Sequence, residues 1–425
     1  MKPLKIVHLP SSYLPRSVGG TEVYVHRLCE ALSARGHSNT IIVHGAKAES
    51  PSSSYDVVSF SPISVKHRAN LYRVSQDQEL KEVETFLRTY RPHAIHFHAL
   101  TLGASSDHFR LAQRLGIPYF ITYHTPTLSC LRGTLLRDGS HVCEGRVEPE
   151  ACASCLFQRQ HIPKPLRGML AKSPISWTRL PNSFWAKWFS MPSLVSSWKQ
   201  NLDDFYGGAR RVIVPAAWCR EVLLKNSVAA EKMVLLRQGV PGATRTRYLK
   251  RPSSTRFTIG YLGRIAPEKG VGTVFELTQK MLVRYPHLKS DFLGPIDPSI
   301  KEWFDKKRSE IPAVSYSGVK PDGQVRSWLD SLDFLILPSR IMETGPLVLL
   351  EAWDAGIPVI GANLGGIREV LLANQLPEFL FDPFDAKSAE LAFKNCLRRL
   401  EKEPLAVVIP GVDDIAQAME KIYAE

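Results

Sequence analysis

The sequence predicts an α/β protein made of two doubly wound domains, and three observations lead to this prediction. Short apolar runs alternate along the chain with longer amphipathic segments, which is the pattern of strands and covering helices in parallel sheets. The length of 425 residues suits two domains of ordinary size. A segment rich in Pro, Gly, Ser and Arg interrupts the alternation at 238–256. We therefore expect domains at 1–237 and 257–408, a linker at 238–256, and a final helix within 409–425 that crosses back to the first domain.

Composition limits where the protein works and what it binds. The formal net charge is +13, which favours an anionic partner such as a nucleotide, a phospholipid surface or a nucleic acid. No run approaches the ~18 apolar residues of a membrane span. The apolar run within Met1–Leu9 is too short for a signal peptide and is typical of a first strand. These features predict a cytoplasmic protein.

In the first half, strands and helices alternate as a parallel sheet requires. Strands are expected at 5–9, 40–43, 94–98, 119–125, 211–215 and 233–236, and helices at 21–36, 76–90 and 106–116. Thr21 is the expected N-cap of the first helix, and Gly36 ends it. Gly19 and Gly20 precede this helix and let main-chain N–H groups approach a phosphate. The pair is not the G-x-G-x-x-G fingerprint, so it does not indicate a dinucleotide site.

Two histidines fall at the carboxyl ends of predicted parallel strands in this half. His98 ends the strand at 94–98, and His124 lies at the end of the strand at 119–125. Open α/β sheets bind ligands at this edge, so both side chains are candidates for the acceptor side of a site. The alternative is a hydrogen-bonded structural role, which suits His96 better than the other two.

Four of the seven cysteines follow His124 closely in the sequence. They are Cys130, Cys143, Cys152 and Cys155, and the glycines between them mark turns. The Cys152-x-x-Cys155 pair with two upstream thiols fits a structural zinc site, and reduced thiols or disulfides are the alternatives. We expect the loop 130–155 beside His124, where it could form one wall of a pocket.

The segment 156–200 combines cations with aromatic rings and contains no Asp or Glu. Its cations are Arg159, Lys164, Arg167, Lys172, Arg179, Lys187 and Lys199, and its tryptophans are Trp177, Trp185, Trp188 and Trp198. This mixture favours an anionic membrane surface. A helical insertion that covers the core and a single-stranded nucleic acid are the alternatives, and we expect no nucleic-acid partner.

The second half repeats the alternation and places two basic side chains at one strand end. Strands are expected at 257–263, 291–294, 314–317, 333–337 and 358–361, and the last helix at 412–423. Arg264 and Lys269 follow the first of these strands and precede a helix, which is a place that suits a diphosphate. Two surface cations on an ordinary loop are the alternative.

Two glutamates frame the start of a later helix in this half. Glu343 precedes the expected helix start at Thr344, Gly345 and Pro346, and Glu351 comes eight positions after Glu343. In a helix this spacing is roughly 12 Å, more than the about 5 to 9.5 Å between the two carboxylates of a glycosidase. The pair therefore indicates two contacts to a long ligand, and the N–H groups of the helix start suit a phosphate.

Three motifs, taken together, resemble one family. They are Gly19-Gly20 after the first strand, Gly263-Arg264-x4-Lys269-Gly270, and Glu343-x7-Glu351 followed by Gly356-x-Pro358. Their order and spacing resemble those of the retaining GT-B glycosyltransferases, family 4 in particular. The resemblance covers nearly the whole chain and is most specific in the second half. It implies two Rossmann-like domains that face each other across a cleft holding a nucleotide sugar.

The resemblance also implies a role for each matching residue. Arg264 and Lys269 would grip the diphosphate, Glu343 would meet the sugar hydroxyls, and Glu351 would meet the ribose. The implied catalytic residues are Arg264, Lys269, Glu343 and His124. The implied donor-binding residues are Gly19, Gly20, Arg264, Lys269, Glu343, Thr344, Gly345, Pro346, Leu347 and Glu351. His98 and His124 would lie on the acceptor side. The family's common Glu-Gly-Phe-Gly is here Glu343-Thr344-Gly345-Pro346, which leaves the sugar open.

The predicted function is a retaining transferase that moves a sugar to a glycan or lipid-linked saccharide of the cell surface. It needs no cofactor, because Arg264 and Lys269 would neutralise the leaving diphosphate in place of a metal. The segment 156–200 would hold it on the inner face of the membrane as a peripheral protein. The alternatives are a nucleotide-sugar 2-epimerase of the same fold and a non-enzymatic polyanion-binding protein.

Overall fold

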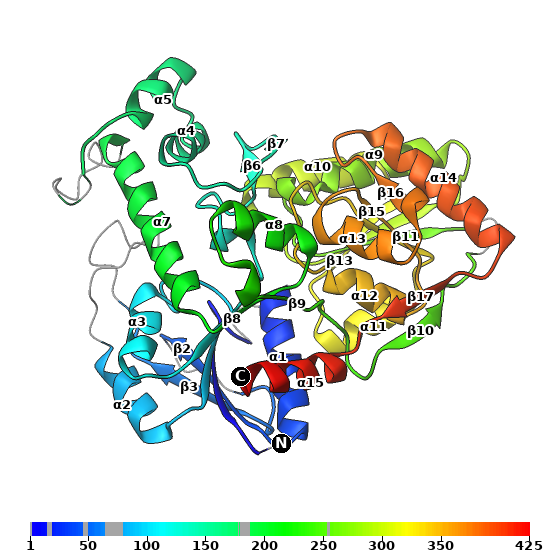
Figure 1. Ribbon diagram of the computed structural model, residues 1–425. Helices are drawn as coiled ribbons and strands as arrows, with labels where there is room; N and C mark the ends of the chain where they lie inside the picture. The colour runs from blue at the N-terminus through cyan, green and yellow to red at the C-terminus, as the bar shows by residue number, and fades with distance from the viewer. Residues whose placement is uncertain are drawn as a thin grey trace. The chain divides into compact units, whose positions relative to one another are not determined.

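The computed structural model describes residues 2–14, 19–45, 50–63, 80–176, 178, 188–252 and 256–425. The chain folds into two compact units (Figure 1). Unit 1 consists of Met1–Arg237 together with Ile415–Glu425, and unit 2 consists of Gln238–Asp414. Each unit contains a parallel sheet covered by helices, which confirms the predicted α/β class. Among the described helices, none is both long and apolar enough to span a membrane.

Seven strands within the described part of unit 1 form one sheet, in the order β3-β2-β1-β4-β5-β8-β9. Their bounds are β1 Lys5–Leu9, β2 Ser38–His44, β3 Asp56–Phe60, β4 Ala94–Phe97, β5 Tyr119–Thr122, β8 Arg211–Val214 and β9 Met233–Leu235. Neighbouring strands pair in parallel. The strand order reverses between β1 and β4, and this is where open α/β sheets bind ligands. Only β3 was missed by the sequence analysis.

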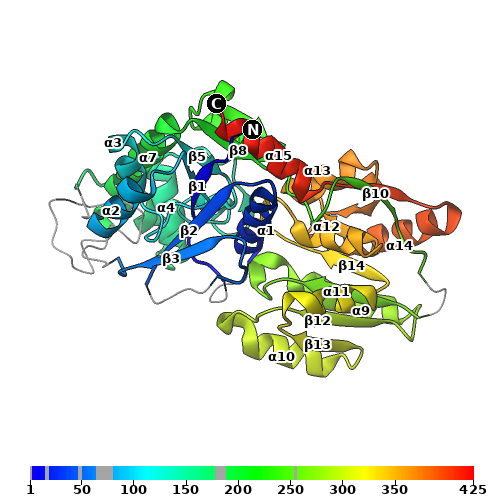
Figure 2. The same cartoon turned by 90° about the horizontal axis from the view of Figure 1, so that it is seen from below.

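Helices pack on this sheet and extend away from it. They are α1 Gly20–Ala34, α2 Lys81–Tyr90, α3 Ser106–Arg114, α4 Pro149–Arg159, α5 Lys164–Ala171, α7 Met191–Gly208 and α8 Ala217–Lys225. A short hairpin, β6 Leu136–Arg137 and β7 His141–Val142, precedes α4. Val25, Leu28 and Leu32 of α1 are fully buried, and the helix packs on β2 (Figure 2).

In unit 1, two predicted helix starts differ from the observed ones. The N-cap of α1 is Gly19 and not Thr21, because the extended backbone at Gly19 leads directly into a helix that begins at Gly20. The helix predicted at 76–90 begins at Lys81, and the predicted residues 76–79 lie outside the described residues.

The last helix, α15 (Val412–Tyr423), closes on unit 1 through a buried carboxylate. Arg35 Nε lies 2.8 Å from one oxygen of Glu420, and His37 Nε2 lies 2.7 Å from the other. Hydrogen bonds from Arg35 hold the pKa of Glu420 below its ordinary value, although burial opposes them. The Tyr423 hydroxyl lies 2.6 Å from Nδ1 of His96 in β4. These contacts tie the end of the described chain to the first unit.

In the described part of unit 2, six strands form a second parallel sheet in the order β13-β12-β11-β14-β15-β16. The bounds are β11 Thr258–Leu262, β12 Lys289–Leu293, β13 Val314–Gly318, β14 Phe334–Leu337, β15 Val359–Ala362 and β16 Leu380–Phe381. The covering helices are α9 Val271–Leu282, α10 Lys301–Glu310, α11 Asp322–Asp330, α12 Leu347–Asp354, α13 Gly365–Ala373 and α14 Ala386–Lys402. The large side chain of Trp353 in α12 is fully buried and packs within the hydrophobic core of unit 2.

The segment 238–256, expected as a linker, belongs to the fold of unit 2. It contains β10 (Arg245–Tyr248), which pairs antiparallel with β17 (Ala406–Ile409). The partner strand lies far away in the sequence, so the local richness in Pro, Gly and Arg did not reveal this strand. Residues 253–255 of the segment lie outside the described residues.

Candidate functional site

Three neighbouring strands of unit 2 each lead into a helix at the same edge of the sheet. β11 precedes α9, β14 precedes α12, and β15 precedes α13. Because the strands are parallel, the amino ends of all three helices gather at the carboxyl edge. Each helix start carries partial positive charge and N–H groups without helical partners, which suits an anion.

Lys269 and Glu343 meet at this edge. Lys269 Nζ lies 2.6 Å from Glu343 Oε1, and the hydroxyl of Ser339 donates to the same oxygen at 2.7 Å. Both charged side chains are 24% exposed. Burial alone would raise the pKa of Glu343, but the charge of Lys269 and the two hydrogen bonds outweigh it, and the pKa is lowered. The structure therefore brings two of the predicted donor-binding residues into one charged pair.

Close main-chain approaches hold the loops of this edge together. The Gly366 N–H donates to Glu343 O at 2.7 Å. Gly365 has a φ of +52°, and a Cβ there would lie 2.9 Å from Glu343 N and O. Gly270 has a φ of +70°, and a Cβ there would lie 1.9 Å from Pro338 O. Only glycine suits these two positions, so the Glu343 loop is held by main-chain contacts with the starts of α9 and α13.

Arg264 lies at the same edge but is more exposed than Lys269. Half of its side chain is exposed, and its guanidinium pairs with Glu268 at 2.5 Å and Asp297 at 3.4 Å. The hydroxyl of Tyr261 donates to the main-chain oxygen of Arg264 at 2.7 Å. The charge of Arg264 also contributes to the lowered pKa of Glu343, so the two side chains share one electrostatic site.

The chain between Glu343 and Leu347 is not helical. α12 begins at Leu347 with Pro346 as its N-cap residue, so Thr344, Gly345 and Pro346 precede the helix. Thr344 and Leu347 are buried, and a Cβ at Gly345 would lie 2.5 Å from the side chain of Gln238. Glu351 therefore lies only about one turn into the helix. The predicted helical spacing between the two glutamates is wrong for this reason.

In unit 1, the start of α1 offers open main chain at Gly20. A Cβ at Gly20 would meet no atom within 4 Å. A Cβ at Gly19 would instead lie 2.8 Å from a carboxylate oxygen of Glu22, whose other oxygen accepts from the Ser12 hydroxyl at 2.9 Å. A phosphate bound at Gly20 would thus share the helix start with the Glu22 carboxylate.

A chain of three buried histidines lies at the carboxyl edge of the sheet of unit 1. His98 Nδ1 lies 3.0 Å from His124 Nε2, and His98 Nε2 lies 3.1 Å from His8 Nδ1. The structure thus brings the two predicted acceptor-side histidines into direct contact. His8 was missed, because it was counted in the apolar run of the first strand. Its place, one residue before the end of β1, was the available signal, since β1 is the neighbour of β4.

These imidazoles are neutral at physiological pH because they are buried. Burial lowers the pKa of His8 to about 4 and that of His124 to about 3, and it lowers the pKa of His98 well below its ordinary value. His96 beside them has Tyr423 at one ring nitrogen and Thr122 Oγ1 at the other, 2.8 Å away. This arrangement gives His96 a structural role.

Family models match both halves of the chain. The model "Glycosyltransferase Family 4" matches residues 18–148, and the model "Glycosyl transferases group 1" matches residues 247–404. Together they cover more than half of the chain. The chain belongs to glycosyltransferase family 4. The range of the second model includes Arg264, Lys269, Glu343 and Glu351, and that of the first includes His98 and His124, the two histidines predicted on the acceptor side.

Similar proteins come from several organisms. The sulfoquinovosyl transferase SQD2 of Arabidopsis thaliana is 28% identical over 44% of this family 4 chain, and the match spans only 38% of that protein's length. A GDP-mannose-dependent alpha-mannosyltransferase of Corynebacterium glutamicum is 22% identical over 86% of this chain and 74% of its own. The structure of Anabaena HepE with UDP and glucose covers 99% of each chain with a TM-score of 0.59 at 14% identity. This structural match confirms the GT-B fold.

The four cysteines of this family 4 chain gather around Cys152. Burial raises the pKa of the Cys152 thiol to about 11, and Cys130, Cys143 and Cys155 are close enough to raise it further. Cys155 Sγ accepts an N–H bond from Asp138 at 3.4 Å. All four are free thiols. Within the described residues, no three of these sulfur atoms converge to within 4.8 Å.

The basic and aromatic segment 156–200 divides into packed and exposed parts. Trp198 is fully buried in α7, Arg167 pairs with Asp138 at 3.1 Å, and Lys199 pairs with Asp203 at 2.7 Å. The exposed side chains on and after α5 include Lys164, Leu166, Met169, Lys172 and Ile175. Trp177, Arg179, Trp185 and Lys187 lie outside the described residues.

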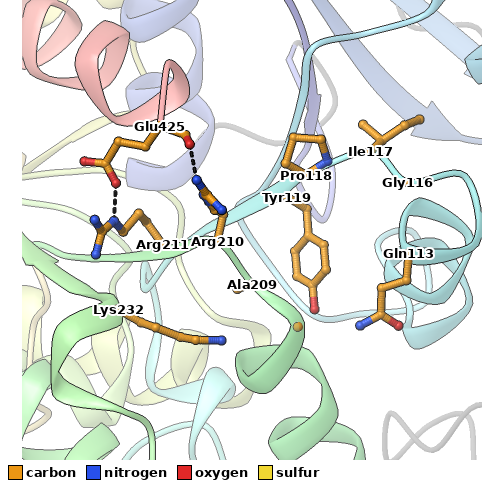
Figure 3. A pocket seen from close by; sticks show the side chains of 11 residues that line it. Gln113, Gly116, Ile117, Pro118, Tyr119, Ala209, Arg210, Arg211, Lys232 and Glu425 are labelled. Atoms are coloured by element: carbon orange, nitrogen blue, oxygen red, sulfur yellow. Dashed lines mark hydrogen bonds and ion pairs between the residues drawn. The ribbon is translucent and has the colours of Figure 1, made fainter.

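A pocket of unit 1 lies at the opposite edge of the sheet from the histidines. It is lined by residues at the amino ends of β5 and β8, with Lys232 and the neighbouring Arg210 and Arg211 (Figure 3). Both arginines pair with Glu425, as Figure 3 shows. This pocket therefore does not coincide with the site predicted from the family motifs.

We predict that Gly365→Ala destabilises unit 2 by at least about 2 kcal/mol, because its left-handed backbone and the close main chain of Glu343 both exclude a Cβ. Gly323→Ala is the matched control, since a Cβ at Gly323 in α11 would meet open space and no positive φ is present. Urea unfolding followed by fluorescence measures both variants. Equal stability of the two variants would contradict the close approach.

Proposed function

We propose that this protein is a retaining glycosyltransferase that moves a sugar from a nucleoside-diphosphate sugar to an acceptor hydroxyl. The observation that carries the proposal is the Lys269–Glu343 pair, set where the amino ends of α9, α12 and α13 gather. A cation and several main-chain N–H groups at one sheet edge suit the diphosphate of such a donor. The adjoining carboxylate suits the hydroxyls of its sugar.

Each unit 2 residue has a task in the proposed reaction. Lys269 and Arg264 neutralise the charge that grows on the diphosphate as its bond to the sugar C1 breaks. The acceptor oxygen forms its new bond to C1 on the same face, and its proton passes to the departing phosphate. Glu343 accepts hydrogen bonds from sugar hydroxyls, and Glu351 accepts them from the ribose. Because two protein cations act on the diphosphate, catalysis needs no metal.

The donor residues of unit 1 and the histidines take the other parts of the substrates. Gly19 and Gly20 offer main chain at the start of α1 to a phosphate, since Gly20 leaves space beside its Cα. His124, with His98 behind it, lines the sugar and acceptor side. The first donors to test are UDP-glucose, which HepE binds in one of its structures, and GDP-mannose, on which the Corynebacterium glutamicum relative depends.

We further propose that α5 holds the protein on an anionic membrane surface, where a lipid-linked saccharide is the acceptor. Lys164 and Lys172 are exposed, and Met169 between them has 63% of its side chain exposed. Figure 1 shows α5 at the end of α4 and α7 that lies away from the sheet of unit 1. Cations beside an exposed apolar side chain are the composition of an interfacial helix.

Loss of either cation should slow the reaction strongly. We expect Lys269→Ala and Arg264→Ala each to lower kcat/KM by a factor that corresponds to about 2 to 4 kcal/mol of transition-state stabilisation. Lys301→Ala is the control, because Lys301 is an exposed lysine of the same unit whose ion pair is with Asp305 in its own helix. Turnover within about threefold of the wild type for both variants would refute the assignment.

Turnover should not depend on a metal ion, whether or not the protein contains a structural zinc ion. We expect turnover to survive EDTA. From the sequence pattern we also propose that Cys130, Cys143, Cys152 and Cys155 hold a structural zinc ion, around which their sulfur atoms would have to draw closer together than they lie here. Elemental analysis of protein purified under reducing conditions should find zinc, and Cys152→Ser should lose it. Cys396→Ser, at a buried thiol in unit 2, is the control that keeps it. Protein without zinc would exclude the metal site and leave the transferase proposal intact.

Membrane binding should need α5 and anionic lipid. Wild-type protein should sediment with anionic vesicles, bind less at high salt, and lose binding when Lys164 and Lys172 become Glu, since each engaged cation contributes about 1 kcal/mol. Met169→Ser should weaken binding further. A pair of exposed lysines in unit 2, Lys301 and Lys387, serves as the control for the same charge change. Equal binding to neutral vesicles, or none to anionic ones, would favour a soluble acceptor.

A further inference from the structure

The pocket at the amino edge of the sheet of unit 1 is large enough for a small molecule. Its volume is about 920 Å³, and small-molecule sites have volumes of roughly 300 to 1,000 Å³. One wall is the chain from the end of α3 into β5, and another is the chain from the end of α7 into β8 (Figure 3). Lys232, just before β9, and Glu425, just after α15, complete the lining. All of these residues belong to unit 1.

The charged side chains that line this pocket are three cations and one carboxylate. The cations are Arg210, Arg211 and Lys232, and the carboxylate is that of Glu425. Arg211 Nε donates to this carboxylate, and Arg210 donates to the main-chain oxygen of the same residue. Within the described part of the chain, no carboxylate pairs with Lys232, whose Nζ donates to Gly207 O. Three positive charges and one negative charge leave an excess of two positive charges among the lining side chains.

Two helix ends reduce this positive excess without cancelling it. α3 and α7 both end at the pocket, since Gly116 and Gly208 are part of its lining. The carboxyl end of a helix carries roughly −0.5 elementary charge, so the two ends bring about −1 against the excess of two. About one positive charge remains, and it would be about two without the carboxylate of Glu425. The pocket therefore favours an anion.

The carboxylate of Glu425 does not use the full capacity of these cations. Its side chain is 40% exposed and that of Arg211 is 32% exposed, so water reaches the ion pair. Ion pairs that are open to water contribute little free energy, so a more highly charged anion can displace the carboxylate. A phosphate monoester carries roughly −1.5 to −2 charge at neutral pH and has three acceptor oxygens. Its oxygens match the planar donor groups of two neighbouring arginines.

The wall of the pocket opposite the cations provides apolar surface. Ile117 is partly exposed there and Pro118 is exposed, and Figure 3 shows Ile117 on the other side of the pocket from Arg211 and Lys232. The hydroxyl of Tyr119 donates to Phe205 O at 2.7 Å, so this polar group already has an acceptor within the fold. A ligand that fills the pocket would thus place its organic group against Ile117 and Pro118.

We propose that this pocket is a second ligand site, which binds a soluble phosphate monoester with its phosphate between Arg210, Arg211 and Lys232. The organic group of the ligand lies against the apolar wall, and the carboxylate of Glu425 competes with the phosphate for Arg211. The pocket lies at the opposite sheet edge from the histidines and contains none of the residues assigned to the donor or the acceptor. The proposal therefore goes beyond the proposed function and does not depend on it.

Calorimetric titration of the full chain with phenyl phosphate tests the site. In a buffer without phosphate, we expect binding that weakens as the salt concentration rises. Inorganic phosphate should bind severalfold more weakly, because it leaves the apolar wall in contact with water. If phenyl phosphate does not bind, the site is excluded. Equal affinity for the two probes would overturn the role of the apolar wall.

A lysine variant locates the bound probe. Lys232→Ala should lower the affinity for phenyl phosphate about tenfold, as expected for the loss of one charge-assisted hydrogen bond. Lys225→Ala is the matched control, since Lys225 is an exposed lysine of unit 1 that pairs with Glu144 at 3.3 Å. Lys269→Ala should also leave the affinity unchanged, which separates this site from the proposed donor site. A loss with Lys269→Ala and none with Lys232→Ala would overturn the proposal.

Glu425→Gln gives the sharper test, because it should strengthen binding. The amide removes the negative charge that competes for Arg211, so the affinity for phenyl phosphate should rise roughly three- to tenfold. Damage to the fold cannot produce such a gain. Glu144→Gln is the matched control, since Glu144 is another exposed, ion-paired glutamate of unit 1. An unchanged or lower affinity of Glu425→Gln protein would refute the competition.

A lipid headgroup can present the same phosphate monoester, and vesicles separate this source from a soluble ligand. Vesicles that contain phosphatidic acid are sedimented with protein that carries Lys164→Glu and Lys172→Glu, so that α5 contributes little. We expect Lys232→Ala to leave the sedimented fraction of this protein unchanged. Sedimentation that depends on Lys232, without binding of phenyl phosphate, would overturn the proposal in favour of a lipid.

Discussion

The parallel pairing of strands in the two large sheets is the constraint on which both candidate sites depend. Within the described residues, each strand pair of these sheets is parallel. Parallel strands end at one common edge, and the helices that follow begin there. Lys269 and Glu343 come from loops 74 residues apart in sequence, yet they share this edge in unit 2. The same geometry gathers His8, His98 and His124 in unit 1.

The two edges differ in charge: the ionisable groups of the Lys269–Glu343 pair are charged at the edge of unit 2, and the buried histidines are neutral at the edge of unit 1. In unit 2, the partly buried carboxylate of Glu343 stays charged. The ammonium of Lys269 and the hydroxyl of Ser339 offset the free-energy cost of its desolvation. In unit 1, the three histidine rings are buried, and burial keeps the imidazoles neutral while His98 hydrogen-bonds to both of the others. A charged edge suits an anion, whereas the neutral histidine rings bring no net charge to the edge of unit 1.

Some contacts near these edges could not be predicted from the local sequence. Gly365 and Gly270 could be recognised as helix-start glycines, but their need to lack a Cβ comes from Glu343 and Pro338, which lie on other loops. β10 could not be predicted because its only strand partner, among the described residues, is β17, about 160 residues later. The N-cap at Gly19 was misplaced by two residues because a Thr is the commoner N-cap by propensity.

The sequence by itself determined the α/β class, the two halves, most strands, and the family motif from Arg264 to Glu351. These follow from local periodicity and from motif spacing, because a strand–loop–helix unit places its loop residues at a sheet edge whatever the rest of the chain does. Only the tertiary structure decided that Lys269 pairs with Glu343, that His8 joins His98 and His124, and that Arg210 and Arg211 meet Glu425. Those contacts join residues that are distant in the sequence, because they depend on which strands and helices pack side by side, and no local pattern specifies that arrangement.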